Sequence, residues 1–183
     1  MRIAWGITGA GDYLEESMEV MASLSRSRDI EVTALVSKNG VLVLKMYKLW
    51  DRLKSDFDKV MVEKGPNQPF IAGRLQTGYY DIFFVSPATA NTVAKLAHGI
   101  ADSLISNCVA QCCKGGTPVV VYPVDQKPGV VTTTAPNGKR VEIGTRHIDL
   151  DNAGRLKGME GMEVVAHPSD IRGIVKRISG GQG

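Results

Sequence analysis

Continuous apolar segments of five or six residues recur along this chain, separated by stretches with helical periodicity. Segments that are apolar throughout, rather than at alternate positions, are typical of strands buried on both faces of a sheet. Such strands belong to parallel sheets covered by helices. The sequence therefore predicts an α/β fold with a doubly wound parallel sheet, and we expect its main strands at residues 3–7, 31–36, 81–85 and 118–122.

Helical spacing of apolar residues fills the intervals between these segments. Leu14, Met18, Met21 and Leu24 share one face of a helix predicted over residues 12–25. Further helices are expected over residues 41–54 and 89–107. The intervening region, residues 64–79, is rich in Gly, Pro and polar residues, which indicates a loop or an irregular strand.

The last third of the chain has a different pattern. Two strand-like segments, residues 130–134 and 139–143, flank the pair Asn137-Gly138. This pair favours a β-hairpin, because the tight turn needs positive φ angles. A short helix over residues 149–156, a strand over 162–165 and a helix over 171–178 follow. We expect a single domain, residues 1–179, and a flexible tail, residues 180–183.

Composition limits the classes of function. The 183 residues carry a net charge of only +3, and 43% of them are hydrophobic. These values indicate a globular domain without the basic surface that nucleic acid requires. No apolar run approaches the ~20 residues that span a bilayer, and the first residues lack a signal-peptide pattern. We therefore expect a cytoplasmic protein that binds neither nucleic acid nor membrane.

Three segments rich in small and hydroxyl-bearing residues follow predicted strands: Thr8–Gly11, Ser37–Gly40 and Ser86–Thr92. In a doubly wound sheet, ligands bind beside the carboxyl ends of the strands, where helix N-termini attract anions. The same residue types also cap helices without any ligand. Three such segments favour a phosphate and polyol site, with candidate residues Thr8, Gly9, Ala10, Gly11, Ser37, Lys38, Ser86, Pro87, Ala88, Thr89, Asn91 and Thr92.

The first of these segments departs from the dinucleotide fingerprint. Its glycines stand at positions 6, 9 and 11, where the fingerprint has the spacing G-x-G-x-x-G. The second strand is followed by Ser37-Lys38, and no acidic residue stands there to hold a ribose. The pattern favours a mononucleotide with a terminal phosphate, whose charge Lys38 can neutralise.

These segments also resemble those of a known family. Residues 87–92, P-A-T-A-N-T, resemble the P-A-S-A-N-T motif of the FMN-binding flavoproteins, which include the homo-oligomeric cysteine decarboxylases. Residues 6–10 and Ser37 match the other two FMN segments of that family. The resemblance implies a Rossmann-like (flavodoxin-like) sheet with helices on both faces, FMN as the cofactor, and trimers that gather into larger symmetric particles. An apolar face at residues 14–24 and the helix around Leu96 and Ile100 are expected to contribute to the assembly.

Two departures separate this chain from the decarboxylases. Their P-x-M-N-x-x-M-W segment is replaced by residues 122–129, Y-P-V-D-Q-K-P-G, and residues 39–54 contain no histidine. The segment D-Q-K-P-G, the hairpin, and the stretch from R-H-I-D at residues 146–149 to M-E-G-M at residues 159–162 instead resemble those of dihydromethanopterin reductases and archaeal electron-transfer flavoproteins. This second resemblance covers nearly the whole chain. The resemblance implies a reductase that passes hydride from FMN to a dihydropterin and takes electrons from an external donor, a ferredoxin or a reductase. The alternative is an electron-transfer flavoprotein without a small substrate, and decarboxylation is less favoured.

Two residues are candidates for catalysis. Asp125 follows the strand at 118–122 and could bond the guanidine-like edge of a pterin, although an Asp there also caps turns. His147 could donate a proton near the flavin, although a histidine beside a hairpin end is commonly a surface residue. His98 is expected to pack or to be solvated, and His167 to lie in a loop.

The three cysteines lie close together in the sequence, at positions 108, 112 and 113. Without a fourth cysteine, and with adjacent residues pointing in different directions on a helix, we expect packing thiols at a helix end and no metal site.

Overall fold

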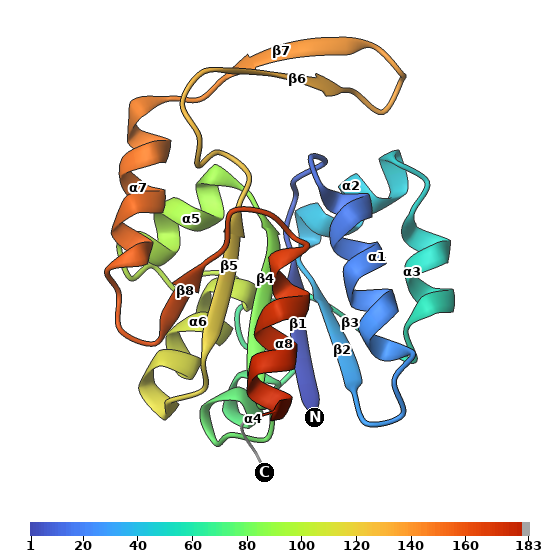
Figure 1. Ribbon diagram of the computed structural model, residues 1–183, viewed down its shortest axis with the longest axis vertical. Helices are drawn as coiled ribbons and strands as arrows, with labels where there is room; N and C mark the ends of the chain where they lie inside the picture. The colour runs from blue at the N-terminus through green and yellow to red at the C-terminus, as the bar shows by residue number, and fades with distance from the viewer. Residues whose placement is uncertain (181–183) are drawn as a thin grey trace.

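The computed structural model describes residues 1–180 and contains a six-stranded parallel sheet (Figure 1). The strand order is that of a Rossmann-like doubly wound fold, in which β8 takes the sixth place. The predicted fold class is therefore confirmed. Across the sheet the strands are β3 (Lys59–Val62), β2 (Glu31–Val36), β1 (Arg2–Ile7), β4 (Ile82–Ala88), β5 (Val119–Pro123) and β8 (Met162–Val164).

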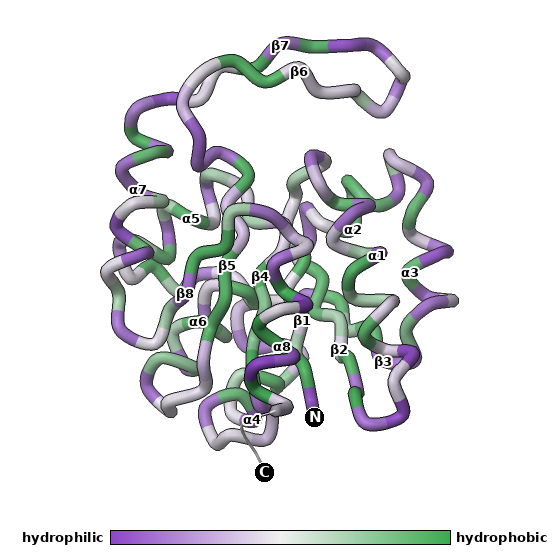
Figure 2. Tube along the Cα trace, in the orientation of Figure 1, coloured by the Kyte–Doolittle hydropathy of each residue, from purple (hydrophilic) through white to green (hydrophobic). Residues whose placement is uncertain are grey.

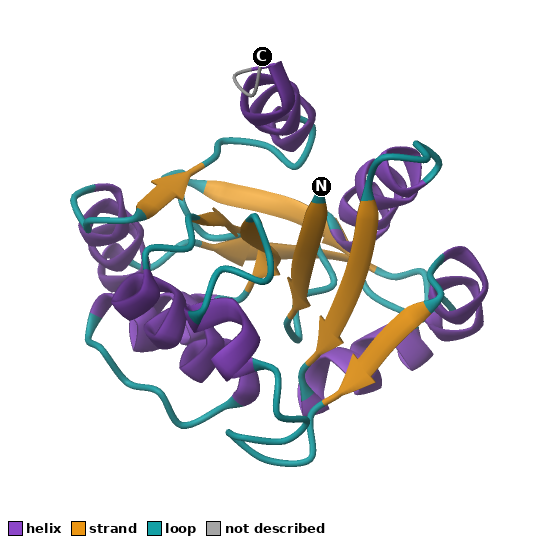
Figure 3. Cartoon of the chain, turned by 90° about the horizontal axis from the view of Figure 1, so that it is seen from below, coloured by secondary structure: helices purple, strands orange, loops and turns teal. Residues whose placement is uncertain are grey.

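Helices cover both faces of this sheet (Figure 3). Successive strand residues point to opposite faces, so Trp5 and Phe84 belong to one core while Ala4 and Phe83 belong to the other. The first core is covered by α1 (Leu14–Ser25), α2 (Lys38–Met46), α3 (Trp50–Asp56) and α8 (Asp170–Gly180). The second is covered by α4 (Ala72–Gln76), α5 (Ala90–Ala97), α6 (Leu104–Gly115) and α7 (His147–Lys157).

The central strands are buried over almost their whole length, as their continuous apolar character predicts. All seven residues of β4 are buried, and so are the last five of β1 and of β2. Figure 2 shows the apolar colour concentrated on these strands and the polar colour on the outer helices. Among residues 1–180, no helix is both long enough and apolar enough to cross a membrane.

Two predicted helices are broken in the structure. The helix expected over 41–54 is two helices, α2 and α3, and Lys48 between them has φ 60°. The helix expected over 89–107 ends at Ala97, and α6 begins seven residues later, after Gly99 with φ 70° and the N-cap Ser103. Both predictions of a single helix were wrong. In each pair the two helices pack on the same face of the sheet, so the apolar periodicity continues across the break between them.

Two elements of the structure were not predicted. Strand β3 is an edge strand in which no residue is fully buried, so its sequence lacks the continuous apolar signal. Helix α4 lies within the region expected to form a loop or an irregular strand, and it is only five residues long. Two predicted boundaries also differ from the structure. Strand β4, predicted to end at residue 85, extends to Ala88, and Gly180, predicted to lie in the tail, is the last residue of α8. The remaining tail residues, 181–183, lie outside the described residues.

The predicted hairpin is present as β6 (Val130–Thr134) and β7 (Arg140–Gly144), a separate two-stranded sheet. Its connection has five residues, and Gly138 alone among them has positive φ, so the tight Asn-Gly turn is replaced by a longer loop. Figure 1 shows the hairpin extending across the carboxyl ends of the central strands.

Candidate functional site

The topological switch point of the sheet lies between β1 and β4, where the chain leaves neighbouring parallel strands toward opposite faces. Thr8 joins the two strand ends. Its hydroxyl donates to the carbonyl oxygen of Pro87 (2.7 Å) and accepts from the amide of Thr89 (3.0 Å). Thr8 is buried, and these two bonds make it a connector of the two predicted ligand segments.

The loop after β1 offers an unusual number of free amides. The backbone N–H groups of Gly9, Ala10, Gly11 and Asp12 donate to no oxygen within residues 1–180. Two close approaches shape this loop. A Cβ at Gly9 would lie 2.9 Å from Cβ of Asn39, and a Cβ at Gly11 would lie 2.5 Å from the Tyr47 hydroxyl oxygen. Clustered amides beside a helix N-terminus are suited to an anion such as a phosphate.

Ser37 caps α2 on the neighbouring strand end. Its side-chain oxygen accepts from the amide of Gly40 (2.9 Å), which leaves the hydroxyl proton available to a ligand. The amide of Lys38 donates to Glu63 (2.9 Å), and the Lys38 side chain is exposed. The second predicted segment therefore offers one hydroxyl donor and one cation at the carboxyl edge of the sheet.

The third segment divides into inward and outward groups. Ser86, Pro87 and Ala88 belong to β4 and are buried. The Ser86 hydroxyl lies 2.8 Å from that of Ser17, so it is bonded within the core and does not face the ligand edge as a free donor.

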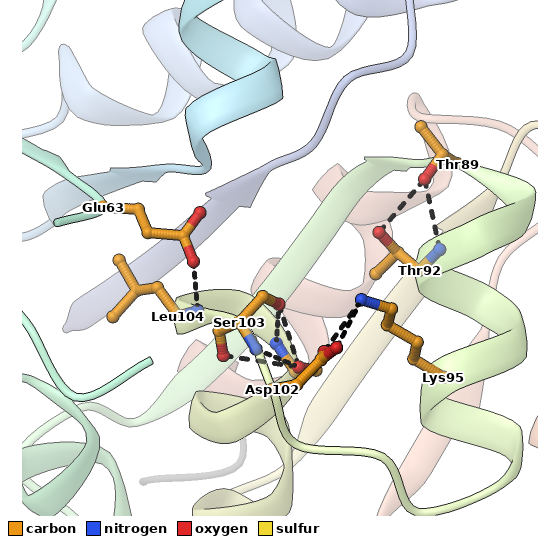
Figure 4. A network of polar contacts seen from close by, with 8 residues as sticks. Glu63, Thr89, Thr92, Lys95, Asp102, Ser103 and Leu104 are labelled. Carbon is orange, nitrogen blue, oxygen red and sulfur yellow. Dashed lines mark hydrogen bonds and ion pairs between the residues drawn. The ribbon is translucent and has the colours of Figure 1, made fainter. Parts of the chain in front are cut away.

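The outward group begins at the N-cap of α5. Thr89 accepts from the amide of Thr92 (3.2 Å), and the two threonine hydroxyls are 3.1 Å apart (Figure 4). Asn91, in the first turn, is exposed. Of the predicted residues in this segment, Thr89, Asn91 and Thr92 are therefore the ones that reach the edge.

Glu63, which the sequence analysis did not identify, connects two helices at this edge of the sheet. Its carboxylate accepts from the first amide of α2, on Lys38 (2.9 Å), and from the first amide of α6, on Leu104 (2.8 Å). Figure 4 shows the second of these bonds next to the Ser103 cap. A carboxylate at a helix N-terminus is stabilising, and here one carboxylate serves two helices. Only the fold brings the end of β3 to both, so no local pattern could identify it.

Asp125 lies just beyond β5 and lines a small pocket at the same edge. Burial raises the pKa of the Asp125 carboxyl, and the negative charges of Asp149 and Asp12 raise it further. Arg146 and the nearby Ala90 amide lower this pKa in turn. A carboxyl group with a raised pKa in a pocket is typical of functional sites.

Gln126 and Lys127 follow Asp125 and also line the pocket. The side-chain amide of Gln126 donates to the carbonyl oxygens of Pro123 (3.0 Å) and Val165 (2.8 Å). It therefore fixes the turn after β5 against the segment after β8, which is a structural role.

A cluster of aromatic rings, also unpredicted, forms one side of this pocket region. The Tyr13 ring makes T-shaped contacts with Tyr122 and with His167, each with ring centroids 5.4 Å apart. Burial is the main cause that raises the pKa of Tyr122, which therefore stays protonated. The sequence separates these residues widely, but all three follow or end strands whose carboxyl ends share one edge. His167 lies in a loop, as predicted.

His147 is the first residue of α7 and is exposed, and it is not among the residues that line the pocket. Its neighbour Arg146 forms two hydrogen bonds with the buried Asp149 (2.7 and 2.8 Å). His98 lies at the exposed end of α5 and contacts Asn152 of α7 (3.2 Å). The role of His147 as a proton donor thus stays a prediction, without support from its position.

The hairpin is attached above this edge by two polar contacts. The Thr133 hydroxyl donates to the carboxylate of Asp12, and the Tyr47 hydroxyl donates to the carbonyl oxygen of Thr134 (3.1 Å). Asp12 belongs to the loop with free amides, so the hairpin and that loop are directly joined.

The three cysteines lie in the middle and the last turn of α6, away from its first residue, Leu104, which bonds to Glu63. Cys108 and Cys112 are buried and Cys113 is exposed. Burial raises the pKa of the Cys108 thiol to about 12, as expected for a packing thiol. Within residues 1–180, no three His, Cys, Asp or Glu side chains are grouped as metal ligands.

The sequence of residues 1–178 matches the profile of the flavoprotein family. The chain belongs to the flavoprotein family. The free amides of the loop after β1 and the Ser37 hydroxyl form the kind of anion site that a flavin phosphate needs.

Two relatives from Methanocaldococcus jannaschii are similar over most of their length. An uncharacterized protein is 47% identical over 175 residues, which cover 96% of this chain and 94% of that protein. A dihydromethanopterin reductase (acceptor) is 46% identical over 231 aligned positions, which cover 93% of this chain and 94% of that protein. The crystal structure of Burkholderia xenovorans DmrB in complex with FMN, described as a cubic protein cage for redox transfer, superposes with a TM-score of 0.84. It is 33% identical in sequence, and the match covers 100% of this chain and 97% of DmrB.

Proposed function

We propose that this protein is an FMN-dependent reductase of a dihydropterin, of the dihydromethanopterin class. The observation that carries the proposal is the adjacency of two sites at one sheet edge. One is a loop in which four backbone amides donate to no oxygen of residues 1–180, and the other is a pocket that contains Asp125. The first suits the phosphate of a mononucleotide and the second suits a polar heterocycle. A relative that is 46% identical and is named a dihydromethanopterin reductase supports the same substrate class.

The chain's own groups divide into those that hold the phosphate and those that hold the polyol. Amides 9–12 and the Ser37 hydroxyl donate to phosphate oxygens, and Lys38 balances the negative charge. Thr89, Asn91 and Thr92, in the first turn of α5, donate to the ribityl hydroxyls. Thr8 and Ser86 act indirectly, because their hydroxyls connect β4 to β1 and to α1.

Asp125 contacts the substrate in this proposal. Bound FMN supplies the reducing equivalents, which an external donor replenishes, a ferredoxin or a reductase. A carboxyl group can accept from the paired N–H groups of a pterin ring, or donate a proton when it is itself protonated. The raised pKa of Asp125 favours the protonated form relative to an exposed aspartate.

We also propose that the protein is a homo-oligomer built from trimers. Its support is the similarity to DmrB, which is described as a cubic cage.

The test is the reoxidation of reduced flavin. The FMN-loaded protein is reduced without oxygen and mixed with a dihydropterin in a stopped-flow instrument. We expect the flavin to be reoxidised by the parent, and at least tenfold more slowly by Asp125→Ala, a change that corresponds to ~1.4 kcal/mol. FMN affinity should stay the same.

The matched control is Asp151→Ala, an exposed aspartate on α7, which should behave as the parent does. If the parent's reduced flavin is not reoxidised by any dihydropterin, the reductase proposal fails, and an electron-transfer flavoprotein without a small substrate is favoured.

A further inference from the structure

A second cavity lies at the amino edge of the sheet, opposite the candidate FMN site. It includes the starts of three neighbouring strands, because Met1, Ile30 and Asp81 immediately precede β1, β2 and β4. Figure 1 shows α8, the N-terminus and the turn between α1 and β2 at this end of the molecule. We call the space among these segments the amino-edge cavity. Its volume is about 500 Å³, within the ~300–1,000 Å³ of ordinary small-molecule sites.

The amino-edge cavity has an apolar floor that the fold holds in place. Leu24 of α1, Ile30 of the turn and Val175 of α8 line the cavity and pack in or against the first core. The backbone amide of Glu31 donates to the carbonyl oxygen of Met1 (2.9 Å), which fixes the start of β2 beside the start of β1. A ligand that covers this floor with an apolar or aromatic surface removes the floor from water, which is favourable.

The α8 side of this cavity carries two cations that no carboxylate of residues 1–180 neutralises. Arg172 and Lys176 stand one helical turn apart, and neither forms an ion pair within the described chain. Like charges at this spacing repel each other, and an anion between them would remove the repulsion. The Arg172 Nε donates to the hydroxyl oxygen of Ser23 (3.3 Å), which orients the guanidinium. Arg177, the third basic residue of α8, pairs instead with Glu163 (2.7 Å) and does not line the cavity.

The parts of the cavity away from α8 carry two carboxylates. Asp29 lies in the turn before β2, and Asp81 precedes β4 and accepts from the backbone amide of Arg2 (2.5 Å). Neither carboxylate pairs with Arg172 or Lys176, although all four side chains line one cavity. The fold therefore keeps unlike charges apart around an apolar floor. A few placed polar groups around an apolar surface are typical of small-molecule sites, where they fix the orientation of the ligand.

These charges define the chemistry of an occupant. A phosphate monoester carries a charge of about −1.5 to −2 at pH 7, which two cations match better than they match a singly charged carboxylate. A carboxylate accepts from paired N–H groups, such as the ring N–H and the amino group of guanine. Adenine presents a ring nitrogen that is an acceptor beside its amino group, and a carboxylate repels it. Inorganic phosphate would neutralise the cations but would leave the floor and the carboxylates uncovered.

We propose that the amino-edge cavity binds a guanine mononucleotide. Its phosphate contacts Arg172 and Lys176, its base lies on the apolar floor, and the N–H edge of the base faces Asp29 and Asp81. The site is separate from the one that the proposed function uses, because the two lie at opposite ends of the same strands. A ligand in this cavity joins α8 to the turn between α1 and β2, so it stabilises the position of the last helix.

The test is isothermal titration calorimetry of the FMN-loaded protein with GMP, because bound FMN keeps GMP out of the phosphate loop at the other edge. The parent should bind one GMP per chain. Arg172→Gln and Lys176→Gln should each raise the Kd for GMP about tenfold, because each removes one charged donor and keeps a side chain of similar length. AMP, guanosine and inorganic phosphate should each bind the parent about tenfold more weakly than GMP does. All four replaced side chains, including those in the double change Asp29→Asn and Asp81→Asn, lie at the surface edge of the cavity, so we expect these variants to fold.

Arg177→Gln is the matched control. It removes the same charge from the neighbouring position of the same helix, but Arg177 does not line the cavity, so the Kd for GMP should stay as it is in the parent. If Arg177→Gln weakens binding as much as Lys176→Gln does, only net charge acts and the site is overturned. A parent that binds no GMP, or that binds inorganic phosphate equally tightly, overturns it too. If the double change Asp29→Asn and Asp81→Asn leaves GMP affinity intact, the carboxylates do not contact the base and the proposed ligand is wrong.

Discussion

Asp125 is the residue whose charge state most affects this site. Because the folded protein raises its pKa, the folded state binds this proton more tightly than the unfolded chain does. The favourable contribution is therefore complete below the ordinary aspartate pKa, ~3.9, and is lost as the pH rises through the raised value. At neutral pH, the charged Asp125 faces Asp12 and Asp149 and disfavours folding.

Asp125→Asn should consequently stabilise the protein at pH 7, and the gain should shrink as the pH falls toward ~4. Urea unfolding of parent and variant between pH 4 and pH 8 measures it as a difference in midpoint. Asp151→Asn, on the exposed surface of α7, is the comparison that should not reproduce the trend. An equal midpoint difference at every pH would show that burial and like charge do not act on Asp125.

At the scale of elements, α6 and α4 approach each other closely at Gly115. A Cβ added to Gly115 would lie 1.8 Å from the carbonyl oxygen of Gln76 and 2.6 Å from its carbonyl carbon. Both are backbone atoms, so one helix would have to move. Nearby, the Thr117 hydroxyl donates to the carbonyl oxygen of Leu75 (2.5 Å), which also holds α4 against the end of α6.

Gly115→Ala should therefore destabilise the protein by about 1–3 kcal/mol through overpacking. The matched change is Gly173→Ala in α8, where an added Cβ meets no atom within 4 Å. That change should stabilise by about 0.5–1 kcal/mol, because alanine favours the helix and restricts the unfolded chain. Denaturant unfolding measures both, and a shift of the same sign at the two positions would contradict the close approach.

The elements also show what a sequence can predict. The four central strands, and the position of the three hydroxyl-rich segments at one edge of the sheet, were predictable. Continuous apolar runs indicate burial on both faces, and parallel strands bring their carboxyl ends together. Glu63 and Tyr13 were not, because one caps two helices distant in sequence and the other depends on a left-handed backbone. The role of Ser86 was not predictable either. Its hydroxyl group suggested a contact with a ligand, but the hydroxyl bonds to Ser17 of α1, which is distant in the sequence.

At the scale of the whole molecule, the apolar surface is not where the helix pattern placed it. Met18 and Met21 of α1 are fully buried in the chain's own core, and Leu96 is 4% exposed. The assembly surface expected from the α1 face and Leu96 was therefore wrong, because α1 covers the sheet, and only Ile100 of that set is exposed. Leu42 and Met46, one turn apart on α2, are 58% and 57% exposed instead.

We predict that α2 forms part of the contact between copies of this chain. Burying a leucine or methionine contributes about 1.5–3 kcal/mol, and a symmetric assembly repeats that gain in every subunit. The double change Leu42→Glu and Met46→Glu would bury unpaired charge in such a contact and should reduce the particle to smaller species. Light scattering after size exclusion measures the mass of the particle, which is compared with the 19.7 kDa of one chain.

The control is Lys114→Glu, at an exposed position of α6. This change should leave the mass of the particle as it is in the parent. Since α2 begins at the Ser37 cap, loss of assembly should also weaken FMN binding. A parent that runs as a 19.7 kDa monomer with FMN bound would rule out this arrangement.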